Sequence, residues 1–171
     1  MNMIFRTLWI FLNRKRVRPS QIDEVTEYQM RVYPTDLDLL FHVNNGVYFS
    51  LMDFGRWDMI FRNGLFDLCK KNDWYAVVAG ESIKFRKSLT CWQKFTLQTK
   101  TIGCDDRYFF IQQKFIYKND VMASGLVKVR FLKKKGGSVS PEEILKELNA
   151  PKVDMKKLSD EWFAIENEFM A

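Results

Sequence analysis

Residues 24–34 alternate between apolar and polar positions, which is the pattern of a strand with one buried face. The two sets are Tyr28, Met30 and Val32 on one face and Glu27, Gln29 and Arg31 on the other. Pro34 is expected to end this strand, because proline has no N–H group to donate to a neighbouring strand.

The pattern changes to helical spacing from Asn45 to about Asn63, with apolar residues on a wide arc. A helix with so wide an apolar arc is predicted to be buried on most sides. Gly55 in its interior costs about 1 kcal/mol relative to alanine, so we expect a sheet to approach the backbone closely there. Gly64 is a predicted C-terminal cap, and a shorter amphipathic helix is predicted over residues 65–71.

Four further strands are predicted, over residues 74–88, 92–102, 107–117 and 121–132. Short turns join them in sequence, and Lys118-Asn119-Asp120 is typical of a hairpin. Parallel neighbours need long crossover connections, so these meandering strands are predicted to be antiparallel. An antiparallel sheet wrapped around one long helix, an α+β fold, is the expected architecture.

The chain divides into three parts. Residues 1–20 are an amphipathic basic segment, residues 21–150 the main domain, and residues 151–171 an amphipathic tail with apolar residues between Leu158 and Phe169. Within the main domain, Ser140 and Pro141 predict the start of a helix that runs to about Leu148.

Residues 1–18 combine apolar positions at helical spacing with a basic cluster. The apolar positions are Ile4, Phe5, Leu8, Trp9 and Leu12, and the basic ones are Arg14, Lys15, Arg16 and Arg18. A secretory signal carries its charge before the apolar run, and this run is well short of the ~20 residues that span a bilayer. Two interpretations stay open: a helix lying in a membrane interface, or a helix docked on its own body or on a partner subunit.

Composition narrows the class of protein. With 47% hydrophobic and 28% charged residues the chain fits a soluble globular domain. The net charge of +6 suits nucleic acid, an anionic membrane or a phosphate-bearing ligand equally well. The aromatic residues mostly alternate inward rather than among the basic ones, which argues against nucleic-acid binding. Three widely spaced cysteines and a single histidine build no metal motif. We therefore expect free thiols and a cytoplasmic protein, with peripheral contact at the inner face of a membrane as an open alternative.

The candidate chemistry lies between the first strand and the long helix. This stretch holds two carboxylates, Asp36 and Asp38, the only histidine, His42, and the amides Asn44 and Asn45. Groups at a helix start lie beside free N–H groups that favour negative charge. The simpler interpretation is an Asx-rich turn with a helix cap. If the segment stays extended, the two carboxylates share one side and repel each other; we favour a loop or cap hydrogen bond for Asp36.

The order of these residues resembles that of the hotdog-fold thioesterases. The matching pattern is Tyr33-x-x-Asp36-x-Asp38-x-x-x-His42-Val43-Asn44-Asn45-x-x-Tyr48, followed by Asp53-x-x-Arg56. It is most similar to the 4-hydroxybenzoyl-CoA thioesterase-like acyl-CoA thioesterases, and the His-Val-Asn-Asn block also resembles plant acyl-ACP thioesterases. The resemblance covers roughly residues 24–135. It implies a hotdog fold with a five-stranded antiparallel sheet, and a homodimer or dimer of dimers with sites at the subunit interface. It also implies an acyl-CoA or acyl carrier protein substrate, and no metal or organic cofactor.

The resemblance also assigns roles. Asp38 would be the nucleophile or the base that activates water, and His42 would assist proton transfer. Asn44 and Asn45 would orient the loop and the substrate, and the N–H groups near Asn45 and Gly46 would polarise the thioester carbonyl. Tyr48 and Asp53 are further candidates for substrate contact, although Asp53 could instead pair with Arg56.

Two residues depart from the family pattern. Phe41 stands where many relatives have glycine, and Leu40 stands where the plant enzymes have asparagine. Phe41 is expected to narrow the acyl pocket or shift the loop. These departures keep open a rival interpretation: a non-catalytic protein that binds acyl thioesters or acts as a membrane-associated interaction module.

Coenzyme A and acyl carrier protein both present phosphate or acidic surface, and two basic stretches could bind them. One comprises Lys84, Arg86 and Lys87, and the other comprises residues 133–135. A solvated basic face is an equally good interpretation of either stretch.

Overall fold

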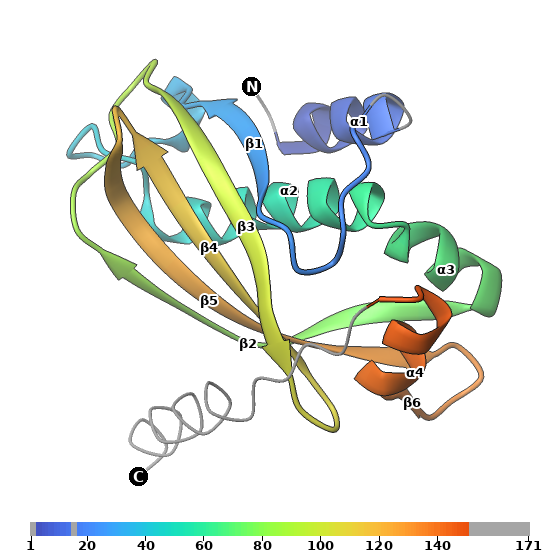
Figure 1. Cartoon of the computed structure of the whole chain (residues 1–171). Helices are drawn as coiled ribbons and strands as arrows, with labels where there is room; N and C mark the ends of the chain where they lie inside the picture. Colours follow the sequence, from blue (N-terminus) through green and yellow to red (C-terminus); the bar gives the residue numbers. More distant parts are fainter. Residues whose placement is uncertain (1–2, 15–16, 151–171) are drawn as a thin grey trace, which may run out of the picture.

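A computed structural model describes residues 3–14 and 17–150 of the chain (Figure 1). Its elements in order are α1 (Met3–Asn13), β1 (Thr26–Arg31), the 3-10 helix η2 (Pro34–Asp36), α2 (Asn45–Arg62), α3 (Leu65–Asn72), β2 (Trp74–Phe85), β3 (Lys94–Cys104), β4 (Phe109–Tyr117), β5 (Asp120–Lys133), β6 (Ser138–Val139) and α4 (Pro141–Glu147). The amphipathic tail predicted over residues 151–171 lies outside the described residues.

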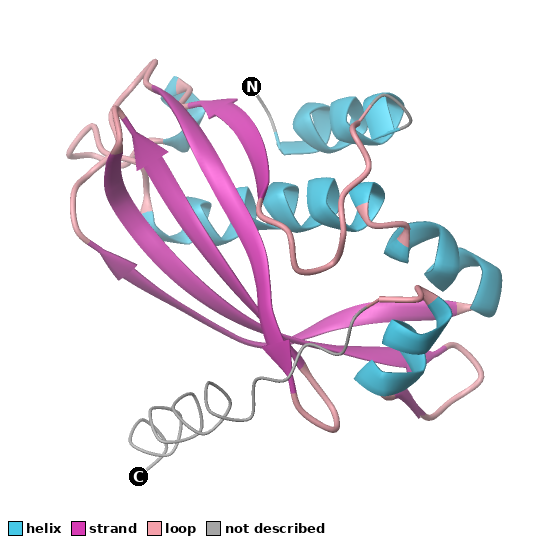
Figure 2. Ribbon diagram, viewed as in Figure 1, coloured by secondary structure: helices cyan, strands magenta, loops and turns pink. Residues whose placement is uncertain are grey.

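All strands belong to one curled antiparallel sheet that wraps around α2, as Figures 1 and 2 show. The order is β1-β3-β4-β5-β2, which confirms the predicted α+β hotdog architecture and its five strands. The two-residue β6 adds a sixth strand beside the end of β5. It forms because Gly136 and Gly137, at φ 99° and 94°, turn the chain back on itself.

The position of β2 differs from the expected meander. β3, β4 and β5 follow one another in the sheet, but β2 pairs with β5 at the far edge instead of with β3. Short connections reveal that successive strands run in opposite directions, but they do not reveal which strands are neighbours. The segment 86–93 therefore crosses one end of the sheet from β2 to β3.

The predicted close approach at Gly55 is confirmed. A Cβ added there would lie 2.5 Å from Thr99 Oγ1 and 2.7 Å from Leu97 Cδ2, both on β3. Gly125 of β5 makes room for Met52 of α2 in the same way, with 2.6 Å to the methionine Cε. These contacts pack the middle of α2 tightly against the sheet.

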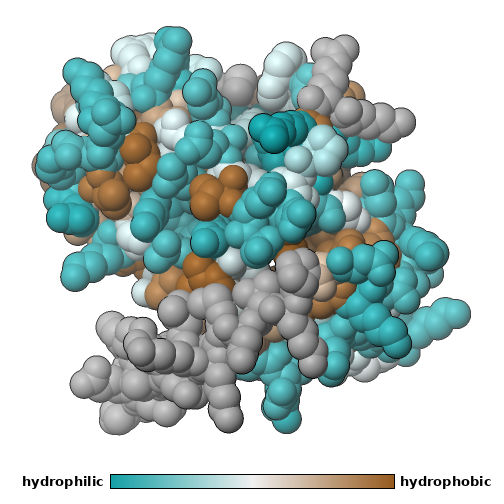
Figure 3. Space-filling view, viewed as in Figure 1, coloured by the Kyte–Doolittle hydropathy of each residue, from teal (hydrophilic) through white to brown (hydrophobic). Residues whose placement is uncertain are grey.

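The N-terminal helix α1 packs on the body through the side that the sequence makes less apolar. Arg6 and Ile10 are buried, and the Phe11 ring lies 5.0 Å from Trp57 and 5.1 Å from Phe61. The residues that define its apolar face remain 54–70% exposed: Ile4, Phe5, Leu8, Trp9 and Leu12. Elsewhere, the face seen in Figure 3 is largely hydrophilic, with apolar residues in small separate patches. None of the described helices is long and apolar enough to cross a bilayer.

Candidate active site

The loop between η2 and α2 is held to the body by backbone hydrogen bonds on both sides. The Val43 N–H donates to the Leu89 carbonyl (2.9 Å), and the Asn44 N–H donates to the Asp36 carbonyl (2.9 Å). His42 also forms an isolated antiparallel bridge with Thr90. The segment that crosses from β2 to β3 therefore lies directly against this loop.

Asp38 is held in the loop by backbone hydrogen bonds. Its Oδ1 accepts hydrogen bonds from the backbone N–H groups of Leu40 (2.8 Å) and His42 (3.3 Å), and its own N–H donates to the His42 carbonyl (2.8 Å). The side chain is half-buried. Among the described residues, nothing donates to the second oxygen, Oδ2. One oxygen therefore fixes the carboxylate, and the other is available to a reacting group.

His42 lies on the same turn, but its imidazole makes no hydrogen bond to another described residue. Asp38 contacts only the backbone of His42: the His42 N–H donates to Asp38 Oδ1, and the His42 carbonyl accepts from the Asp38 N–H. The structure thus brings the two predicted catalytic side chains into one small loop without a direct side-chain bond between them.

The start of α2 has an ordinary asparagine cap. The Asn44 Oδ1 accepts from the Gly46 N–H at 2.9 Å, so this amide is already engaged. The exposed Asn45 is the first helical residue, and its backbone N–H has no partner in the described part of the chain. At the positive end of the helix dipole, the Asn45 backbone N–H is better placed than the engaged Gly46 N–H to meet a developing negative charge.

Tyr48 packs in the core behind this loop. Its side chain is 2% exposed, and its ring packs edge-on against Phe85 and Phe115 at about 5 Å. The hydroxyl accepts from the Leu89 N–H at 3.3 Å, and burial raises the pKa of the phenol. Leu89 in turn accepts from Val43. The structure therefore gives Tyr48 a packing role behind the loop.

Asp36 is separated from Asp38 in both position and role. The 3-10 helix η2 interrupts the extended backbone, so the two carboxylates do not share the side that an extended segment would give them. The Asp36 Oδ2 accepts from the Tyr33 N–H at 2.9 Å, which confirms the predicted cap, and lies 2.6 Å from Arg6 Nη2. Its partner across 30 residues, Arg6, was not anticipated from the sequence.

Asp53 lies eight residues beyond Asn45 on α2, about 12 Å along the helix axis, and belongs to another cluster. It pairs with Arg56, one of the two interpretations left open by the sequence. Arg56 also lies 2.6 Å from Glu81 Oε1 of β2 and donates to Gln113 Oε1 at 3.0 Å. Burial raises the pKa of Glu81, and the Arg56 charge opposes that shift. Glu81 was missed in the sequence, where a lone acid in an apolar strand is its only signal.

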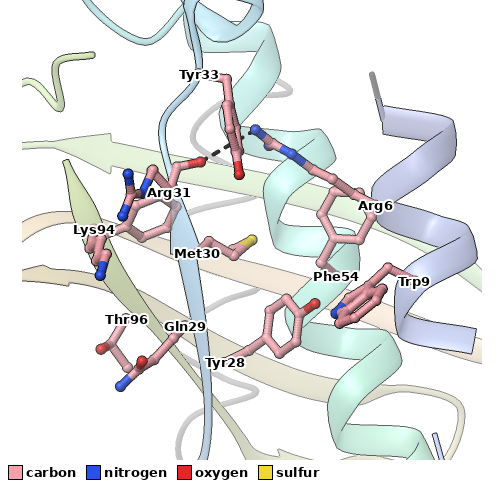
Figure 4. A pocket seen from close by; sticks show the side chains of 11 residues that line it. Arg6, Trp9, Tyr28, Gln29, Met30, Arg31, Tyr33, Phe54, Lys94 and Thr96 are labelled. Atoms are coloured by element: carbon pink, nitrogen blue, oxygen red, sulfur yellow. Dashed lines mark hydrogen bonds between the residues drawn. The ribbon is translucent and has the colours of Figure 1, made fainter. Parts of the chain in front are cut away.

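Two cavities lie near the helices. One, of about 430 Å³, is a largely apolar space between α2, α3 and the sheet, with Asp53 and Arg56 in its wall. The other, of about 510 Å³, lies between α1 and β1, where Arg6 reaches past the Tyr33 ring to the Arg31 carbonyl (Figure 4). Neither cavity is lined by Asp38 or His42.

The two basic stretches are at opposite ends of the molecule. Residues 84–87 are exposed at the end of β2 and lead directly into the segment beside the loop; within them, Lys87 pairs with Asp120. Residues 133–135 lie beside the start of β2, where Lys134 pairs with Asp73. The 12 residues of β2 span about 40 Å, so Lys84 and Arg86, not residues 133–135, share the end of the sheet with Asp38.

The tip of the loop is apolar and open to solvent. Leu39, Leu40 and Phe41 are 97%, 74% and 77% exposed. Phe41 has φ 59°, in the left-handed region that favours glycine. The glycine that the resemblance implies for many relatives would adopt this backbone freely, whereas the phenylalanine is held in a strained conformation.

The cysteines and acids of the described residues do not form a metal centre. No group of three or more His, Cys, Asp or Glu side chains in this part of the chain is arranged to hold an ion. Cys69, Cys91 and Cys104 all lie in the described part of the chain, where none of them forms a disulfide.

Comparisons with known proteins agree with this architecture. The Thioesterase-like superfamily matches residues 32–163. Protein THEM6 of Xenopus laevis is 33% identical over 131 residues, covering 72% of this chain and 63% of that protein, so the chain spans less than two thirds of this relative.

Among solved structures, the probable thioesterase YbaW of Escherichia coli matches with TM-score 0.67 at 21% identity, covering 75% of this chain and 98% of that one. The DHNA-CoA thioesterase of Staphylococcus aureus matches with TM-score 0.66 at 13% identity, covering 84% and 94%. The chain therefore belongs to the Thioesterase-like superfamily, whose hotdog fold it has.

Proposed function

We propose that this protein hydrolyses acyl thioesters, of coenzyme A or of acyl carrier protein, at the loop that carries Asp38. The main observation behind the proposal is the Asp38 carboxylate next to the first turn of α2. Its Oδ1 accepts two backbone hydrogen bonds, and its Oδ2 has no donor among the described residues. The family, and the structural neighbours that are named thioesterases, support hydrolysis as the reaction.

The chemistry needs a nucleophile, a polarised carbonyl and a proton for the leaving thiol. The Asn45 N–H and the helix dipole would stabilise the negative charge that develops on the carbonyl oxygen. The Asp38 Oδ2 would either attack the carbonyl carbon or take a proton from the water that attacks it. If water attacks, the C–S bond breaks and the free acid and the thiolate form directly. If Asp38 attacks, the C–S bond breaks to leave an acyl anhydride on Asp38, which water then hydrolyses to the free acid. In either case His42 would carry a proton to the sulfur.

A second copy of the chain would complete the site. Neither cavity reaches Asp38, while the tip at Leu39, Leu40 and Phe41 is open to solvent. We propose a homodimer or dimer of dimers in which the acyl group lies between protomers. Lys84 and Arg86 are then the candidates for the phosphates of coenzyme A or the acidic surface of a carrier protein.

Thiol release from a panel of acyl-CoA and acyl carrier protein substrates tests the reaction directly. Asp38→Asn keeps the size of the side chain and removes its charge, so we expect kcat/KM to fall about 10²–10⁴-fold with an unchanged melting temperature. Asp106→Asn is the matched control, an exposed acid in the turn between β3 and β4, and should retain full activity.

The absence of thiol release from every substrate, or full activity in Asp38→Asn, would contradict the proposal. Saturable binding of an acyl-CoA without thiol release would instead support the rival function, a non-catalytic acyl-thioester-binding protein.

A further inference from the structure

One side of α1 is apolar and uncovered. Five large side chains recur on it at helical spacing and are 54–70% exposed: Ile4, Phe5, Leu8, Trp9 and Leu12. Single exposed apolar residues are ordinary on protein surfaces, but a contiguous group of this size marks an interaction surface. We call these five residues the apolar face of α1.

The outward direction of this face is set by buried contacts on the other side of the helix. Arg6 is 6% exposed and bonded to Asp36, and Ile10 is 3% exposed. Phe11 packs among aromatic rings of α2 and α3. Rotating α1 to bury the apolar face would break the Arg6–Asp36 pair and leave a charge buried without its partner. The exposed face is therefore part of the docked arrangement.

The charge beside the apolar face indicates what covers it. Residues 1–18 contain no acidic residue, and Arg14, Lys15, Arg16 and Arg18 directly follow the helix. A helix with Trp, Phe and Leu on one side and a cluster of cations at its end has the composition of segments that lie at anionic lipid surfaces. At 11 residues, about 16 Å, α1 can lie in such an interface but cannot span it.

We propose that α1 is a peripheral membrane-binding helix, with its apolar face inserted at the boundary of the acyl chains, and that the positive charge of the sequence following the helix attracts anionic phospholipid headgroups. The proposal is independent of the chemistry at Asp38. Covering the apolar face with lipid removes five large side chains from water, and the basic residues add an attraction that salt weakens.

Vesicle flotation of the full chain tests the proposal. We expect the protein to float with vesicles of phosphatidylcholine that contain about three phosphatidylserine molecules in ten, and to bind pure phosphatidylcholine at least about tenfold more weakly. Raising the salt to about 0.5 M should release most of the protein.

Two sets of substitutions separate the apolar from the electrostatic contribution. Leu8→Gln with Leu12→Gln keeps helix propensity and should weaken binding to anionic vesicles by about tenfold or more. Lys15→Gln, Arg16→Gln and Arg18→Gln together should remove the preference for phosphatidylserine. Val25→Gln, a matched control at a residue 50% exposed outside α1, should bind like the parent protein.

Failure of the parent chain to bind anionic vesicles, or unchanged binding by the double leucine variant, would overturn the proposal. The same holds if the leucine variant lowers the melting temperature, since its leucines would then pack on the body. If light scattering shows that the parent self-associates through α1 and that the leucine variant is smaller, a second copy covers the apolar face and the membrane is not its partner.

Discussion

Arg6 of α1 and Asp36 of η2 form a buried ion pair across 30 residues of sequence, with 2.6 Å between Nη2 and Oδ2. The same Asp36 oxygen accepts from the Tyr33 N–H, and the Asp36 carbonyl accepts from the Asn44 N–H. The N-terminal helix is thereby connected through one aspartate to the cap of α2. Asp36 holds the loop in place, whereas Asp38 keeps its Oδ2 without a donor among the described residues.

Removing one member of this pair should be costly. Arg6→Met leaves the Asp36 charge buried without its partner, and we expect the free energy of unfolding to fall by about 3–5 kcal/mol. Asp36→Asn should lower it by a similar amount, and the double variant should lose much less than the sum of the two. Urea denaturation of all four proteins measures the coupling. Additive losses would show that the two side chains act independently. Asp120→Asn, which breaks the exposed pair with Lys87, is the control and should change little.

Gly55→Ala should destabilise the protein although alanine is the better helix former. The added methyl would lie 2.5 Å from Thr99 Oγ1 and 2.7 Å from Leu97 Cδ2, where the sheet meets α2. We expect a net loss of about 1–3 kcal/mol in the free energy of unfolding, because overpacking outweighs the gain in helix propensity. Gly46→Ala is the comparison on the same helix, where the new methyl meets only the end of Asn44 at 3.3 Å. A stabilised Gly55→Ala variant would mean that α2 and the sheet can move apart at little cost.

Phe41 allows the cost of its backbone conformation to be separated from the effect of its ring. At φ 59°, Phe41→Gly should be more stable than Phe41→Ala by about 1 kcal/mol, the reverse of the usual order for these residues. Both variants lack the ring, so any change in acyl-chain preference that they share reports on the side chain. Denaturation curves measure the cost of the backbone conformation, and kcat/KM for short and long acyl-CoAs measures the effect of the ring on acyl-chain preference. A more stable alanine variant would refute the strained conformation.

Glu81 should make stability depend on pH in a defined direction. Burial raises its folded-state pKa above the ordinary value of 4.5, with Arg56 opposing this shift and Asp53 adding to it. Between the unfolded and folded pKa values the folded protein binds more protons, so the contribution of Glu81 is fully present below pH 4.5 and is lost as pH rises. The stability of the parent relative to Glu81→Gln should therefore decline from about pH 4 to pH 7. Thermal melts at several pH values measure this difference, and Glu147→Gln, at an exposed position, should show no such trend. A difference that grows with pH would show that the Arg56 pairing outweighs burial.

Much of this fold follows from local patterns. Alternation identified β1, helical spacing identified α2 almost to the residue, and the hairpin turn at Lys118–Asp120 joined β4 to β5. Local patterns also predicted the loop with Asp38 and His42 and an asparagine cap at the start of α2. These features depend on side chains close together in sequence, whose periodicity and turn chemistry are nearly independent of the rest of the chain.

The sequence by itself therefore determined the element types and the antiparallel sheet around a buried helix. The tertiary structure decided that β2 lies beside β5, that Arg6 faces the body while the apolar face of α1 points outward, and that Glu81 meets Arg56. It also separated the roles of Asp36 and Asp38, two residues of the same type in one loop. Each of these outcomes depends on contacts between segments far apart in the chain. Local sequence patterns do not predict such contacts, because strand pairing and side-chain packing form only in the complete fold.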